Sequence, residues 1–102
     1  MEKVIRNGKV AVLISADYGA GWSTWNDNDC LFTPEIVELV LAEADTDLIQ
    51  EAATRLYGSG FYTGGASGLT IEWVPEGQKF IVNEYDGYES ITLLSNIKGV
   101  EA

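Results

Sequence analysis

The sequence contains no histidine and only one cysteine, Cys30. Without histidine there is no Ser/His or Cys/His catalytic pair, no imidazole acid or base near pH 7 and no zinc site with a His ligand. A lone cysteine makes no internal disulfide and no Cys-cluster metal site, and it is typical of a reduced, intracellular protein. We therefore expect no catalytic residues of these kinds, no metal and no cofactor.

Basic residues are also scarce. Six Lys and Arg stand against 16 Asp and Glu, which gives a formal net charge of −10, and no basic residue lies between Lys9 and Arg55. A surface of this sign repels nucleic-acid phosphates and acidic membranes. We expect no direct nucleic-acid binding and no membrane partner, whereas a basic surface of another protein fits the charge.

Long hydrophobic runs are absent as well. The apolar run at residues 10–14 is far shorter than the roughly 18 residues of a membrane span, and it lies too deep in the chain for a signal peptide. A length of 102 residues fits one domain with a core of its own, which we place at about residues 8–95. The sequence predicts a soluble, cytoplasmic, single-domain protein.

The order of elements follows from hydrophobic patterning. Residues 9–15 contain a continuous apolar run, at residues 10–14, that is rich in β-branched side chains, which predicts a strand buried on both faces. Thr33-Pro34 is a helix start, a second cap signal follows at residues 44–47, and Gly58 ends the second helix. Three strands separated by turns are expected at residues 69–74, 79–84 and 89–94.

These elements predict an α+β fold: a single β-α-α-β-β-β domain with a mostly antiparallel sheet and two helices packed on one face. Short connections favour reversal of direction between consecutive elements. The loops at residues 16–32, 57–68 and 84–89 should then meet at one end of the sheet.

Aromatic residues gather in these same loops. Seven of the eleven in the chain lie there: Tyr18, Trp22, Trp25, Phe61, Tyr62, Tyr85 and Tyr88. Trp and Tyr beside amide and carboxylate groups suit a site that stacks a base, a sugar or a cation. The other interpretation is an aromatic cap that closes the open end of a small sheet. The candidate ligand-binding residues are Tyr18, Gly19, Gly21, Trp22, Trp25, Asn26, Tyr62, Thr63, Glu84, Tyr85, Asp86 and Tyr88.

Three segments in these loops also carry a resemblance. They are Tyr18-Gly19-Ala20-Gly21-Trp22-Ser23-Thr24-Trp25-Asn26, Tyr62-Thr63-Gly64-Gly65 and Glu84-Tyr85-Asp86-Gly87-Tyr88-Glu89. Together they resemble a group of small proteins of tailed phages and prophages, and the likeness covers roughly residues 8–92. The resemblance implies a phage origin and the cytoplasm of an infected or lysogenic bacterium. It implies no activity.

Glycines and carboxylates in the loops each have two interpretations. The Gly19-Ala20-Gly21 turn either cradles a phosphate with its N–H groups or lets Trp22 fold back onto the sheet. In a functional interpretation, the loop carboxylates hold Mg²⁺ or Ca²⁺, or they form an acid/base pair. In a structural interpretation, they cap turns and helix ends. The residues in question are Asp17, Asp27, Asp29, Glu84, Asp86 and Glu89.

A second acidic set lies on the predicted helices. A row of helical carboxylates is either a solvated face or a surface that competes for a basic groove. Its candidate partner-binding residues are Glu35, Glu38, Glu43, Asp47 and Glu51.

Three functions remain open at this point. The leading hypothesis is an interaction protein that inhibits or redirects a host protein, such as a defence component, through its acidic face or its aromatic end. The alternatives are a module that sequesters a small molecule such as a nucleotide-derived signal, and a small carboxylate-dependent enzyme. An exposed sheet edge would also allow a homo-oligomer.

Overall fold

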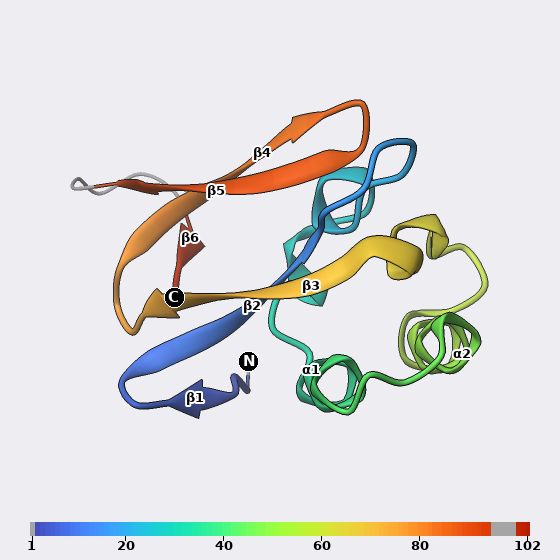
Figure 1. The fold of residues 1–102 in the computed structure, drawn as a ribbon, viewed down its shortest axis with the longest axis horizontal. Helices are drawn as coiled ribbons and strands as arrows, with labels where there is room; N and C mark the ends of the chain where they lie inside the picture. Colours follow the sequence, from blue (N-terminus) through green and yellow to red (C-terminus); the bar gives the residue numbers. More distant parts are fainter. Residues whose placement is uncertain (1, 95–99) are drawn as a thin grey trace.

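The fold has three layers, seen from the side in Figure 1. The structure is a computed structural model that describes residues 2–94 and 100–102. The first layer holds two helices, α1 (Pro34–Leu41) and α2 (Thr46–Tyr57). The middle layer is a sheet of β1 (Ile5–Arg6), β2 (Lys9–Ser15) and β3 (Leu69–Pro75). The outer layer is a sheet of β4 (Lys79–Tyr85), β5 (Tyr88–Leu94) and β6 (Val100–Glu101). The short 3-10 helices η1 (Ser23–Trp25), η2 (Asn28–Cys30) and η3 (Gly64–Gly68) lie in the connections.

The α+β class is confirmed, and the strands are divided between two sheets. The strand orders are β1-β2-β3 and β5-β4-β6, and every pairing is antiparallel. The helices cover one face of the middle sheet, and the outer sheet covers the other (Figure 1).

The two-sheet arrangement follows from β2, which is buried on both faces as predicted. Its side chains alternate between the two sides, as in any strand. Ala11 and Leu13 pack against the helices, whereas Val10, Val12 and Ile14 pack against the outer sheet. A strand that is apolar on both faces needs a cover on each side, and two short helices provide only one.

The helices begin and end where the sequence indicates. Thr33 is the N-cap of α1 and Pro34 its first residue, while Gly58 follows α2 with a φ of 93°, a conformation that suits glycine. The Thr33 hydroxyl does not bond its own helix but pairs with the hydroxyl of Tyr57 at the end of α2. The start of α1 is thereby tied to the end of α2.

Two short strands lie outside the predicted core of residues 8–95. Ile5 and Arg6 of β1 pair with β2, and β6 pairs with β4 at Lys79 and Phe80. Residue 95 lies outside the described residues. No helix in the part of the chain that the structure describes has the length and apolar character needed to cross a membrane.

Replacing Leu13 tests the helix side of the core. Leu13 is fully buried, so Leu13→Ala should lower the free energy of unfolding by about 2–5 kcal/mol through lost burial and the cavity left behind. The control, Leu56→Ala, removes the same atoms from a side chain that is 42% exposed and should cost about 0.5 kcal/mol or less. Urea denaturation measures both, and equal losses would contradict this packing.

Candidate functional site

The three loops that were predicted to meet at one end of the sheet do meet there. The N–H of Gly19 donates to the carbonyl of Asp86 at 2.6 Å, which joins the loop after β2 to the β4–β5 turn. Asn26 bonds Tyr62 twice: its Oδ1 accepts from the Tyr62 N–H at 2.8 Å, and its Nδ2 donates to the Tyr62 carbonyl at 3.0 Å. In Figure 1 the loop after β2 and the β4–β5 turn lie together at the upper right.

Glu89 on β5 anchors this end of the molecule. Its side chain is 1% exposed and accepts four hydrogen bonds. Oε1 accepts from the Ser15 N–H at 2.8 Å, while Oε2 accepts from the Trp22 N–H at 2.8 Å, the Thr24 N–H at 3.0 Å and the Thr24 hydroxyl at 2.6 Å. A carboxylate, which only accepts, matches four donors. The outer sheet is thereby bonded directly to the loop that leaves the middle sheet.

In the sequence, Glu89 is one of six loop carboxylates. The structure assigns it the role of a loop anchor. A signal was present in the strand pattern, because Glu89 shares a face with Ile91, which packs on the core between the sheets. A single acidic residue on the apolar face of a strand indicates a buried, bonded carboxylate.

Glycines allow the loops to pack backbone against backbone. A Cβ at Gly65 would lie 2.4 Å from the carbonyl oxygen of Gly21, and one at Gly87 would lie 2.3 Å from the backbone nitrogen of Ala20. These positions therefore tolerate no side chain without movement of a neighbouring loop. Because the Gly19 N–H is engaged by Asp86, that group is not free to cradle a phosphate.

Trp22 lies in the core, where a ligand does not reach it. It is fully buried, its Nε1 donates to the Cys30 carbonyl at 2.9 Å, and its ring packs edge-on against Phe61 with centroids 5.0 Å apart. Trp22 was a candidate ligand-binding residue, but its side chain folds back onto the sheet. Cys30 beneath it is also buried, and burial raises the pKa of its thiol to about 12, so the thiol is protonated at neutral pH.

Five other aromatic side chains remain exposed, and we call them the aromatic surface: Tyr18, Trp25, Tyr62, Tyr85 and Tyr88. Tyr18 is 68% exposed and Tyr85 77%. The Tyr18 ring lies 5.1 Å from that of Tyr88 and 6.5 Å from that of Tyr85, while Trp25 and Tyr62 form a second pair at 5.2 Å. The rings therefore contact one another in two groups.

Glu84 links the two halves of the aromatic surface. Its Oε2 accepts from the Gly87 N–H at 2.7 Å, inside the β4–β5 turn, and from Nε1 of Trp25 at 3.2 Å. The bond from Gly87, followed by the bond from Trp25, lowers the pKa of the Glu84 carboxyl. The exposed carboxylate holds the turn and the indole in one geometry.

The remaining predicted residues of this end serve the loop framework. Asp27 caps η2 by accepting from the Asp29 N–H at 2.9 Å, and the carbonyl of Thr63 accepts from Nε2 of Gln50 at 3.2 Å. Asp86 occupies the β4–β5 turn with a φ of 50°. Within residues 2–94 and 100–102, no three Asp, Glu or Cys side chains converge as ligands of a metal ion would.

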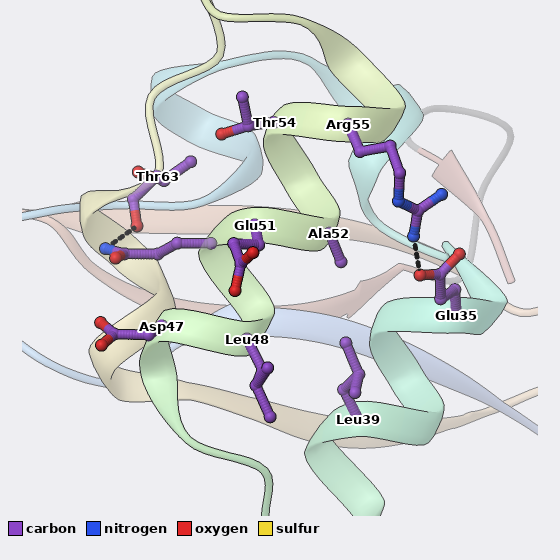
Figure 2. A pocket seen from close by; sticks show the side chains of 10 residues that line it. Glu35, Leu39, Asp47, Leu48, Glu51, Ala52, Thr54, Arg55 and Thr63 are labelled. Carbon is purple, nitrogen blue, oxygen red and sulfur yellow. Dashed lines mark hydrogen bonds and ion pairs between the residues drawn. The ribbon is translucent and has the colours of Figure 1, made fainter.

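The helical carboxylates differ in the groups that they contact. Glu38 pairs with Arg6 at 3.5 Å, Glu35 pairs with Arg55, and Glu43 is exposed just beyond the end of α1. Glu35, Asp47 and Glu51 line a hollow of about 940 Å³ between α1 and α2, shown in Figure 2. A second hollow of about 310 Å³ is lined by Arg6, Asn7, Lys9 and Trp73. Neither hollow is lined by a residue of the aromatic surface.

Comparison with protein-family models, with curated proteins and with solved structures found no significant match to this chain.

The anchoring role of Glu89 can be tested by Glu89→Gln. An amide replaces one acceptor oxygen with an NH₂ group, which then faces a backbone N–H in a buried site. The loss of charged hydrogen bonds and the unpaired donor should lower the free energy of unfolding by about 2–4 kcal/mol. The exposed Glu76→Gln is the matched control, and chemical denaturation of both variants is the measurement. An effect no larger than that of Glu76→Gln would contradict the anchor.

The lowered pKa of Glu84 predicts a local effect of pH. Because the folded-state pKa is depressed, the stabilisation is complete above the ordinary value of 4.5 and is lost as pH falls through the lowered one. The Gly87 amide and Trp25 indole NMR signals should therefore titrate together with a midpoint below 4.5. In Glu84→Gln this shared titration should disappear, and a wild-type midpoint at or above the ordinary value would refute the assignment.

Proposed function

We propose that this chain is a small, non-catalytic binding protein of phage or prophage origin that engages a host protein through its aromatic surface. In the cytoplasm of the infected or lysogenic bacterium it inhibits or redirects that partner, with a defence protein as the candidate class. The observation that carries the proposal is that five exposed aromatic side chains gather at one end of the fold, where the buried Glu89 carboxylate holds the loop after β2.

The choice of residues supports protein binding. Tyr and Trp offer large contact areas for few rotatable bonds, and they dominate the energetics of protein interfaces. Tyr18 and Tyr85 are mostly exposed, yet they contact each other at the same end of the molecule. Since the loops beneath are bonded to one another, little conformational freedom is left to lose on binding.

The charge of the surroundings supports a partner with basic side chains. Glu84 and Asp86 lie in or next to the β4–β5 turn that carries Tyr85 and Tyr88. An arginine stacks on a tyrosine ring through cation–π contact and pairs with a neighbouring carboxylate. The net charge of −10 favours the same class of partner at longer range.

The packing of the rings favours a protein over a small molecule at this end. A small-molecule site encloses most of its ligand in a cleft. Here Trp22 is buried, Trp25 packs on Tyr62 and Tyr18 packs on Tyr88. Rings that pack on one another in this way fit a protein surface laid across them.

Affinity capture from bacterial lysate, with quantitative mass spectrometry, tests the proposal. The wild-type chain should recover one host protein in near-equal amount, and the double variant Tyr18→Ser/Tyr85→Ser should recover at least about tenfold less. Leu41→Ser/Leu56→Ser is the matched control, because it removes two exposed apolar side chains from the helices. Binding of the purified partner should then show the same ranking by calorimetry.

Two results would overturn this function. One is equal loss of the partner in the tyrosine and leucine double variants, which would indicate general stickiness. The other is a nucleotide or another small molecule that raises the melting temperature of the wild type but not of the tyrosine variant, which would favour the ligand-binding alternative.

A further inference from the structure

A second surface lies on the opposite layer of the fold, between α1 and α2. We call it the helical groove, and its volume is about 940 Å³. The residues that line it include Glu35 and Leu39 of α1 and Asp47, Leu48, Glu51 and Arg55 of α2. Figure 2 looks into it, with α1 and α2 on its two sides.

One part of the helical groove is apolar. Leu39 of α1 and Leu48 of α2 stand at the same end of it (Figure 2). Leu48 is 50% exposed, whereas Ala52, one turn further along α2, is buried. A half-exposed leucine beside another leucine offers a small apolar contact to an incoming side chain.

The charges of the groove are unevenly balanced. At the end away from the leucines, Arg55 of α2 reaches across to pair with Glu35 of α1 (Figure 2). Asp47 and Glu51 lie one turn apart on α2, and both line the groove. Within the described residues neither of these two takes part in an ion pair. A cation between them would relieve their mutual repulsion.

We propose that the helical groove binds a segment of a partner protein that presents a lysine or arginine beside an apolar side chain. The apolar side chain packs on Leu39 and Leu48, and the basic one meets Asp47 and Glu51. The Arg55–Glu35 pair closes the far end and shows how a basic side chain is held between the helices. This inference rests on the proposed function in one respect, since it takes the partner to be a protein.

Charge complementarity selects this occupant. A segment with acidic side chains would be repelled by Asp47 and Glu51, and by the net charge of −10. A small polyamine would satisfy the carboxylates but would leave the leucines uncovered. An amphipathic basic segment satisfies both parts of the groove, which is the way helices and short motifs commonly dock into such surfaces.

The test uses the full chain, ¹⁵N-labelled, and a synthetic 14-residue peptide of lysine and leucine with amphipathic spacing. The matched peptide replaces each lysine with glutamate. The lysine peptide should shift amide signals of Leu39, Leu48 and Glu51, and the glutamate peptide should shift none. Because the contact is largely electrostatic, affinity should fall by about tenfold between 50 and 300 mM salt.

Variants separate the local groove from the overall charge. Asp47→Asn/Glu51→Gln should weaken peptide binding at least about fivefold, whereas Glu72→Gln/Glu76→Gln, with the same change in net charge, should weaken it less than twofold. Leu48→Ser should weaken binding too, and Leu56→Ser, on the same helix but outside the groove, should not. The proposal would be overturned if the two variants of either matched pair weakened peptide binding equally. It would also be overturned if spermidine gave the same amide shifts and the same affinity as the peptide.

This experiment fails independently of the proposed function. Tyr18→Ser/Tyr85→Ser should bind the lysine peptide as the wild type does, because the aromatic surface lines no part of the helical groove. If the peptide does not bind while capture of the host protein still depends on the tyrosines, the groove is refuted and the proposed function stands. If the peptide binds in the groove and capture does not depend on the tyrosines, only the aromatic surface is refuted.

Discussion

The buried carboxylate of Glu89 is the contact on which the loop end of this protein depends. It belongs to the outer sheet, yet all four of its hydrogen bonds go to the last residue of β2 and the loop beyond it. Once Trp22 and Thr24 are held by this side chain, the indole of Trp22 enters the core and the indole of Trp25 reaches Glu84. One acidic residue on β5 thus holds the backbone from which both indoles project.

Much of the fold could be predicted from local sequence, because the relevant signals are local. The apolar run of β2, the Thr33-Pro34 helix start and the glycine after α2 each depend on neighbours in the chain. The division into two sheets could not be predicted in the same way. It depends on which strand pairs with which, and β1 and β6 are too short to show a pattern of their own.

The candidate site was predictable in its location and not in its details. The expected direction of each strand was enough to predict that the aromatic loops meet at one end. The hydrogen bonds between Gly19 and Asp86 and between Asn26 and Tyr62 show that they do. The different fates of Trp22 and Trp25, three residues apart, depend on the path of an irregular loop, for which sequence periodicity carries no information. The helical groove was equally hidden, because Arg6 of β1 pairs with Glu38 and Arg55 of α2 pairs with Glu35 of α1, and sequence spacing does not show such contacts.

The backbone contacts at Gly65 and Gly87 have a consequence for how such a surface changes over evolutionary time. Antibody loops diversify by changing length, because each loop stands largely apart from the next. Here Gly65 abuts Gly21 and Gly87 abuts Ala20, so an insertion in any one loop would displace the others. Under the proposed function, a new binding preference is reached by exchanging exposed side chains such as Tyr18 or Tyr85 on an unaltered backbone. On the same proposal, related chains with different partners should share loop lengths and glycines and differ in their exposed rings.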